Sequence, residues 1–208
     1  MSVRQILTSL VLSALLCGAS SLAQAQSAAP KGAKDTAKPA AAAKPAAKPE
    51  TAAAAAAGGA EPTLIGQFGT WGAYTATPNG KKVCFALAKP SSSKTNPPNR
   101  PRDPAYAFVS TRPAEKVTNE VSIMIGYALK PGSESSLEVG GASYSMYTQG
   151  DGLWIKNAAE EERMVDAMRK AADVTVKGVS AKGTETTDTF SLKGLSQALD
   201  KLAQDCRR

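Results

Sequence analysis

The distribution of large apolar side chains divides the chain into two unlike parts. Between Gln26 and Pro62 there is no Val, Ile, Leu, Met or aromatic residue, and the segment consists mainly of Ala, Lys and Pro. All eleven aromatic residues lie between Phe68 and Phe190. A segment without apolar side chains cannot offset the entropy that is lost when its backbone is ordered. The sequence therefore predicts a disordered linker over residues 26–62 and one folded domain over residues 63–208.

The first 25 residues have the organisation of a secretory signal peptide. Arg4 precedes an apolar run that starts at Ile6, and Ala23 and Ala25 are the small residues of a cleavage site that follows Ala25. The apolar run is about 14 residues long, whereas a membrane-spanning helix needs about 20. We therefore expect export and cleavage of residues 1–25, with no transmembrane helix left in the mature protein.

Histidine is absent from the chain. Its absence excludes Ser-His-Asp and Cys-His nucleophile systems, His-ligated zinc and histidine proton shuttles. In the folded part, over residues 63–208, the excess of 19 basic over 15 acidic residues is spread without a dense cluster, and this dispersion, like export, disfavours nucleic-acid binding. The sequence thus predicts no cofactor, no metal site and no nucleic-acid partner.

After Pro62, short apolar runs alternate with turn residues, which is typical of a β-rich domain. The pair Asn79-Gly80 favours a tight hairpin between strands near residues 68–75 and 82–89. Alternation of apolar and polar residues predicts further strands over residues 106–110, 121–129, 136–139, 143–148, 153–156, 174–179 and 184–192. The expected fold is mainly β, with β-sandwich-like antiparallel sheets preceded by a disordered tail.

Two helices are predicted near the C-terminus. Asn157 is placed to cap the first, with Glu160 three residues later as in a capping box. The inward faces carry Met164, Val165 and Met168 in the first helix and Leu195, Leu199 and Leu202 in the second.

Removal of the signal leaves two cysteines, Cys84 and Cys206, in a compartment where a disulfide can persist. Cys206 extends the inward leucine stripe of the second helix by one turn. Cys84 lies beside Ala86 and Ala88 in a predicted strand, whose small side chains let a helix approach closely. These positions predict a structural Cys84–Cys206 disulfide, with two buried or free thiols as the alternative. No Cys-x-x-Cys motif points to a redox role.

Catalytic patterns are weak. Ser91 and Lys94 match the Ser-x-x-Lys pattern of penicillin-recognising enzymes, but they lie in a loop where a helix is implausible. Acids such as those at 160–162, or Glu185 with Asp188, would serve a glycosidase only if two of them faced each other across a cleft, and solvated surface charge is the favoured interpretation. We predict no catalytic residue. The alternative function is a periplasmic hydrolase that acts on envelope polymer through carboxylates or a Ser-Lys pair.

The loop over residues 91–104 is the most credible contact element. A loop of about 15 residues in a compact domain is more often functional than accidental. It carries Lys94, Arg100 and Arg102, which we predict as candidates for contact with a partner, either a protein or a component of the envelope or host surface. A rigid cover over a sheet edge is the alternative.

Four short motifs between Phe68 and Leu199 keep an order and spacing found in a known family. They are Phe68-Gly69-Thr70-Trp71, Gly80-Lys81-Lys82-Val83-Cys84, Gly126-Tyr127-Ala128-Leu129-Lys130-Pro131-Gly132 and Phe190-Ser191-Leu192-Lys193-Gly194-Leu195-Ser196-Gln197-Ala198-Leu199. With these motifs the chain resembles the invasion-associated locus B (IalB) family, exported proteins of alphaproteobacteria. The chain departs from many members at Thr75, where they carry a cysteine, and between Tyr147 and Trp154, where they carry a later cysteine pair.

The resemblance implies a location in the periplasm or on the outer surface of a Gram-negative bacterium. It also implies a role in virulence for some relatives, through entry into host cells. We therefore expect an exported, non-enzymatic protein that binds a partner through the loop over residues 91–104.

Overall fold

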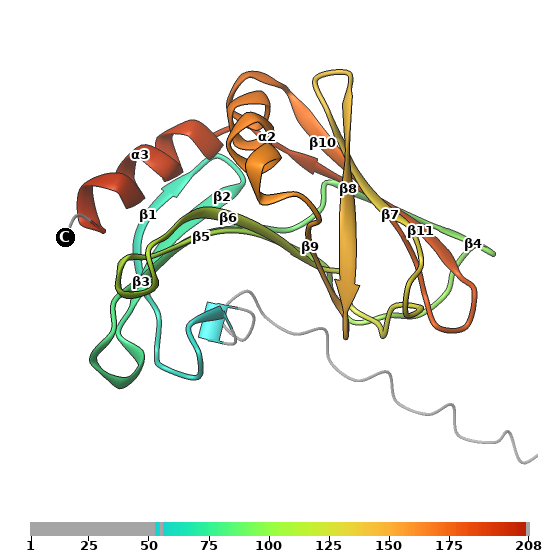
Figure 1. Cartoon of the computed structure of the whole chain (residues 1–208), viewed down its shortest axis with the longest axis horizontal. Helices are drawn as coiled ribbons and strands as arrows, with labels where there is room; N and C mark the ends of the chain where they lie inside the picture. Colours follow the sequence, from blue (N-terminus) through green and yellow to red (C-terminus); the bar gives the residue numbers. More distant parts are fainter. Residues whose placement is uncertain (1–52, 55, 207–208) are drawn as a thin grey trace, which may run out of the picture. The chain divides into compact units, whose positions relative to one another are not determined.

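The computed structural model describes residues 53–54 and 56–206. The predicted signal peptide, with Ala23 and Ala25, and most of the predicted linker lie outside the described residues. Within the described part, β-strands account for most of the regular structure, and two helices lie near the C-terminus (Figure 1). This arrangement confirms the predicted mainly antiparallel β class.

Eleven of the described segments are strands of one antiparallel sheet. They are β1 (Thr63–Phe68), β2 (Trp71–Ala76), β3 (Val83–Ala88), β4 (Ser92–Asn96), β5 (Tyr106–Arg112), β6 (Val117–Met124), β7 (Ser135–Val139), β8 (Ala142–Gln149), β9 (Gly152–Ile155), β10 (Asp173–Val179) and β11 (Glu185–Ser191). The helices are α2 (Ala158–Lys170) and α3 (Leu195–Asp205). The strand order is β1-β2-β3-β5-β6-β9-β8-β7-β10-β11-β4, which leaves β1 and β4 at the two edges.

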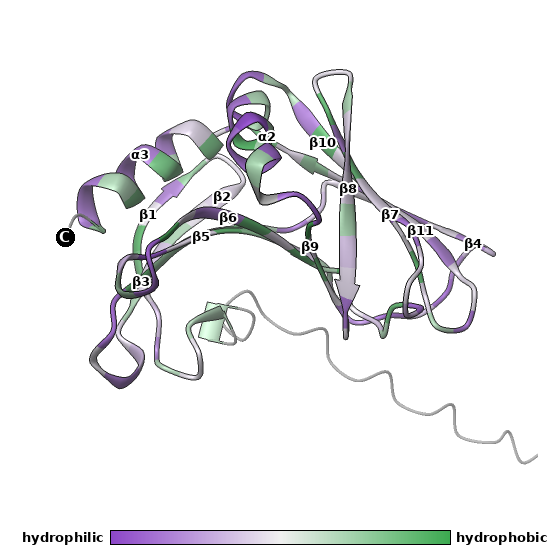
Figure 2. Ribbon diagram, in the orientation of Figure 1, coloured by the Kyte–Doolittle hydropathy of each residue, from purple (hydrophilic) through white to green (hydrophobic). Residues whose placement is uncertain are grey.

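One main core joins the two halves of this sheet to the helices. Buried side chains from β3 and β6, such as Ala86 and Ile123, belong to the same apolar cluster as Val176 and Phe190 from β10 and β11. Figure 2 shows hydrophobic residues along the central strands beneath α2 and α3. The sheet therefore encloses its core from two sides, as a sandwich does, although its hydrogen-bonded order is continuous.

The predicted cap of the first helix and the inward faces of both helices are confirmed. The Asn157 side chain accepts a hydrogen bond from the backbone N–H of Ala159 at 3.1 Å, which satisfies one of the free donors at the start of α2. The predicted inward residues of both helices are buried: Met164, Val165, Met168, Leu195, Leu199 and Leu202.

The predicted disulfide joins the C-terminal end of α3 to the sheet. Cys84 in β3 and Cys206 after α3 are bonded, with their Cα atoms 6.2 Å apart. Both are buried, and Ala86 and Ala88 beside Cys84 belong to the same core. The bridge closes a separation of 122 residues and holds α3 against β1, β2 and β3.

The structure differs from the prediction in three strands. Edge strands β1 and β4 were not expected, because neither Thr63–Phe68 nor Ser92–Asn96 alternates apolar with polar residues. Both form by backbone pairing with a single neighbour, β1 with β2 and β4 with β11, and such pairing leaves no alternating pattern in the sequence. The strand expected over residues 121–129 ends at Met124, because the chain turns at Gly126 with a φ of 83°.

The last part of the predicted linker also lies differently. Residues 53–54 and 56–60 lie against the sheet, and Ala53 and Ala57 are completely buried in a second apolar cluster with Phe85, Tyr106 and Phe108. The physical reason is that alanine, although a weak apolar residue, fits closely against a flat aromatic surface. None of the helices among the described residues has the length and hydropathy of a membrane span.

Candidate functional site

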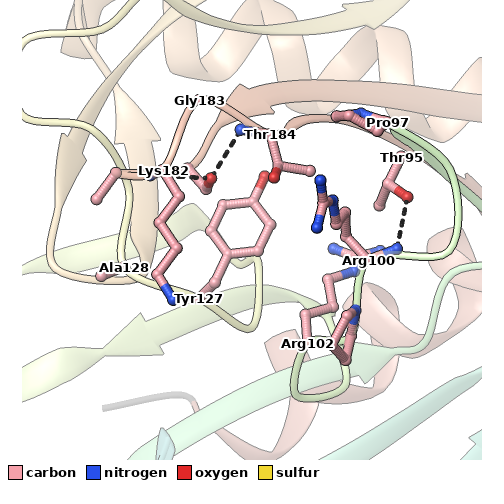
Figure 3. A pocket seen from close by; sticks show the side chains of 12 residues that line it. Thr95, Pro97, Arg100, Arg102, Tyr127, Ala128, Lys182, Gly183 and Thr184 are labelled. Carbon is pink, nitrogen blue, oxygen red and sulfur yellow. Dashed lines mark hydrogen bonds between the residues drawn. The ribbon is translucent and has the colours of Figure 1, made fainter.

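A cavity of about 580 Å³ opens where the β4–β5 loop meets the β10–β11 turn. The segment that follows β6 forms its floor, with the Tyr127 ring between the two loops (Figure 3). The residues that line it are Thr95, Pro97, Arg100, Pro101, Arg102, Tyr127, Ala128, Ser180, Ala181, Lys182, Gly183 and Thr184. We call this space the cationic cavity.

A buried ion pair anchors the β4–β5 loop at the cavity. The side chain of Asp188 on β11 is fully buried, and that of Arg102 is 11% exposed. The Arg102 guanidinium binds both carboxylate oxygens of Asp188, with Nη1 donating to Oδ2 at 2.7 Å, and Nη1 also donates to the Ile125 carbonyl oxygen at 2.8 Å. Such a two-point pair fixes the loop in orientation as well as position.

Strand β11 explains why an acid is buried here. Its inward face carries Thr186, Asp188 and Phe190 at alternate positions, and all three are buried. Phe190 belongs to the main core, whereas the two polar residues lie beyond it. A buried carboxylate requires a partner, and Arg102 supplies it.

Position 126 requires glycine because the backbone of Asp103 lies close to it. The Asp103 N–H donates to the Gly126 carbonyl oxygen at 2.9 Å. A Cβ atom at position 126 would lie 2.0 Å from the Asp103 carbonyl oxygen, and the φ of 83° is one that other residues rarely adopt. The loop therefore reaches the segment after β6 only because residue 126 has no side chain.

Two cations at the cavity have no acidic partner. Arg100 and Lys182 both line the space, and within the described part of the chain neither side chain forms an ion pair. No carboxylate is among the lining residues. The backbone N–H of Arg100 donates to Thr95 Oγ1 at 3.2 Å, which ties the loop to β4. At Arg100 and Lys182 the cavity therefore carries positive charge that no acidic group of the described residues neutralises.

Hydroxyl groups complete the polar lining. The Tyr127 hydroxyl donates to Thr186 Oγ1 at 2.6 Å, and burial raises the pKa of this phenol, so it remains protonated at neutral pH. Ser180 Oγ accepts the N–H of Thr184 at 2.9 Å and that of Lys182 at 3.3 Å. These bonds hold the β10–β11 turn, and with it the base of the Lys182 side chain, in one conformation.

This arrangement can bind an anion. Guanidinium and ammonium groups are donors only, and they pair well with the oxygens of carboxylate, phosphate or sulfate. The anchored loop and the fixed turn hold the backbone of the two cationic residues before a ligand arrives, which lowers the entropic cost of binding, while both side chains remain exposed to solvent.

The three predicted contact residues, Lys94, Arg100 and Arg102, have different surroundings in the structure. Arg100 lies at the cationic cavity with its charge available. Arg102 also lines the cavity, but its guanidinium is engaged by Asp188 and by Ser93 Oγ at 3.0 Å. Lys94 is not among the lining residues, because it lies between Ser93 and Thr95 on β4 and alternate residues of a strand face opposite sides.

Sequence reasoning missed Tyr127, Lys182 and Thr184. Lys182 lies in the connection between the strands predicted over residues 174–179 and 184–192, and nothing in the sequence indicated that β4 pairs with β11 and brings the two loops together. The period-two pattern of β11 was a usable signal for Asp188, since it places that acid on the same face as Phe190. The interpretation of Asp188 as surface charge is therefore wrong.

The two proposed catalytic arrangements are not assembled. Ser92–Asn96 is a strand, so a serine and a lysine three positions apart do not share the turn of a helix. Glu185 and Asp188 lie three positions apart on β11 and thus on opposite faces, and Asp188 is neutralised by Arg102. Among the described residues no group of three or more Cys, Asp or Glu could hold a metal ion.

Glu161 gives a pH-dependent prediction away from the cavity. Burial raises its pKa above the ordinary value of 4.5, although the Val121 N–H donates to its Oε1 at 2.8 Å. Folding therefore disfavours the charged form. Ionised Glu161 lowers the free energy of unfolding at pH values above its folded pKa, and the residue has no such effect at pH values below its ordinary pKa. We expect Glu161→Gln, which retains an acceptor oxygen, to be more stable than the parent at pH 7 and equally stable near pH 3.

Urea unfolding at the two pH values checks this prediction. Glu162→Gln is the control, because the neighbouring Glu162 is exposed and should show no such gap. An equal gain from Glu161→Gln at both pH values would contradict the assignment to ionisation.

Two of the resembling motifs meet in the structure. The Thr70 N–H donates to the Lys193 carbonyl oxygen at 3.3 Å, and the Trp71 indole N–H donates to the Ser191 carbonyl oxygen at 2.9 Å. A Cβ atom at Gly194 would lie 2.0 Å from the Phe68 carbonyl oxygen. These motifs therefore join the start of the sheet to the segment that leads into α3.

Comparison with known families gives a match to the family described as invasion associated locus B (IalB) protein over residues 71–203. No curated protein and no solved structure gives a match. The matched residues extend from β2 into α3 and so include most of the main core, Cys84 but not Cys206, and the cationic cavity. The chain therefore belongs to the invasion-associated locus B family.

Proposed function

We propose that this protein is an exported, non-enzymatic binding module that holds an anionic group of its partner in the cationic cavity. The observation that carries the proposal is the pair of unneutralised cations, Arg100 and Lys182, on two loops that are fixed by Asp188 and Ser180. The partner is a protein or polymer of the envelope or host surface that presents carboxylate or phosphate groups. The family membership and the Cys84–Cys206 disulfide both support an exported protein.

Loss of the two cations tests the proposal. Each charge-assisted hydrogen bond contributes about 1.5 to 3 kcal/mol, so we expect Arg100→Gln/Lys182→Gln to weaken the binding of inorganic phosphate roughly tenfold or more. Isothermal titration calorimetry at low salt measures the affinity. The control variant Lys94→Gln/Lys156→Gln removes the same charge from residues that do not line the cavity and should bind as the parent does. If both variants lost the same affinity for phosphate, the net charge of the protein would explain the binding, and the proposal would be contradicted.

Localisation is tested with protease on intact cells that carry an epitope near the C-terminus. Export to the outer surface predicts cleavage while a periplasmic marker stays intact, and residence in the periplasm predicts cleavage only after the outer membrane is permeabilised. Protection after permeabilisation, together with recovery in the cytoplasmic fraction, would contradict export.

A further inference from the structure

The sheet has a second apolar face, on the side away from α2 and α3. Aromatic rings from β2, β3 and β5 form it. Tyr74 stacks on Phe85 with ring centres 5.3 Å apart, and Phe108 lies 6.3 Å from both Phe85 and Tyr106. We call this surface the aromatic face. The aromatic face continues along the sheet to Trp154. Phe108 on β5 pairs with Ser122 on β6, and Ser122 in turn pairs with Trp154 on β9.

A short piece of the N-terminal segment already occupies part of the aromatic face. The described residues 53–54 and 56–60 include helical positions, and the Ala57 N–H donates to the Ala53 carbonyl oxygen at 2.9 Å, as in a helical turn. In Figure 1 this turn lies on the opposite side of the strands from α2 and α3. Ala53 and Ala57 have no exposed surface and pack in the cluster that contains Phe85 and Phe108. The aromatic face therefore accepts an alanine-rich segment of this chain.

A cavity of about 470 Å³ continues from the alanine turn. Ala56 forms one wall, and Tyr106, Phe108, Met124 and Trp154 supply apolar and aromatic surface. A volume of this size falls within the range of about 300 to 1,000 Å³ that ligand pockets occupy. The space beside the turn is therefore large enough to receive more chain.

The rim of this cavity is acidic. Asp103 and Asp151 line it and are both exposed, and among the described residues neither side chain forms an ion pair. Glu120 also lines the cavity but is paired with Arg112. The available charge at this site is thus negative and suits a cationic occupant.

We propose that the segment Lys44-Pro45-Ala46-Ala47-Lys48-Pro49 of the same chain docks in this cavity. The chain enters the aromatic face at Ala53, five residues after Lys48, and an extended segment of that length spans about 15 Å. Proline-containing segments bind aromatic grooves in extended form, and small residues such as Ala46 and Ala47 let the backbone approach the rings. The lysines carry the charge that Asp103 and Asp151 complement. This contact does not depend on the proposed function of the cationic cavity.

A spin label in the segment tests the contact in the full mature chain. We use Ala46→Cys, since both native cysteines are held in the disulfide and leave the new thiol as the labelling site. The chain has two tryptophans, of which Trp154 lines the cavity and Trp71 is buried in the main core. We expect the indole N–H signal of Trp154 to lose at least half of its intensity, and that of Trp71 to change much less. A label at Ala28→Cys should leave both signals intact.

Charge variants and a mixed sample identify the occupant. Lys44→Glu/Lys48→Glu should restore the Trp154 signal, whereas Lys31→Glu/Lys34→Glu, with the same change of charge, should not. In the mixed sample, one set of chains carries the isotope and no spin label, and the other set carries the spin label and no isotope. Loss of the Trp154 signal only in this mixture would show that a second copy supplies the segment and would overturn the intramolecular contact. An unchanged Trp154 signal, or equal loss at Trp71, would overturn the proposal altogether.

Discussion

Replacement of Asp188 by asparagine is expected to lower the free energy of unfolding by about 3 to 5 kcal/mol, because it leaves the charge of Arg102 without its partner in a site that water scarcely reaches. Urea unfolding at neutral pH measures the change. The control is Asp200→Asn, which breaks the pair with Arg169 at the surface, where the Asp200 side chain is 64% exposed. That exposed pair is worth no more than about 1 kcal/mol.

Removal of both charges separates the cost of an unpaired ion from the value of the pair. Arg102→Met/Asp188→Leu replaces the pair with apolar side chains, and such replacements are often neutral or stabilising. We therefore expect the double variant to recover much of the stability that Asp188→Asn loses. A loss of less than about 1 kcal/mol for Asp188→Asn would mean that the pair does not anchor the loop.

Replacement of both cysteines should be about as costly. The bridge closes a separation of 122 residues, for which the chain-entropy model gives a contribution of about 4 to 5 kcal/mol. We expect Cys84→Ala/Cys206→Ala to lose stability of this order, and the oxidised parent treated with a reductant to lose a similar amount. Denaturant unfolding with and without reductant measures both. The reductant should leave the alanine variant unchanged, and a parent that is equally stable in both redox states would contradict a structural role for the bridge.

Local patterns were sufficient where one segment decides its own structure. The cap at Asn157, the inward methionines of α2 and the leucine stripe of α3 follow from helix periodicity and capping alone. The disulfide followed from the same stripe, because Cys206 continues it toward small residues around Cys84. These features require no knowledge of how distant strands pair.

The cationic cavity depends on such pairing and was only partly predictable. Strand β4 is polar throughout and becomes a strand by pairing with β11, a pairing that joins Thr95 to Thr186 across about ninety residues of sequence. This edge pairing brings Arg100 near Lys182. The sequence therefore indicated a contact loop but not the second loop that faces it.

The burial of described residues before Thr63, at positions 53–54 and 56–60, could not be predicted from the sequence either. Their composition predicts no core of their own, and Ala53 and Ala57 are buried in a cluster formed with side chains of β2, β3 and β5. A weakly apolar segment can be ordered by a partner surface that composition alone does not reveal. Described residues that precede the first large apolar residue therefore pack against the sheet.

The most direct test of the anion-binding cavity is a nuclear magnetic resonance titration of the mature protein with inorganic phosphate. The account predicts that the largest, saturable amide shifts map to the β4–β5 loop and the β10–β11 turn, at Thr95, Arg100, Lys182 and Thr184, and that they vanish in Arg100→Gln/Lys182→Gln. Shifts that are spread over all surface lysines without saturation, or that persist in this variant, would contradict the account.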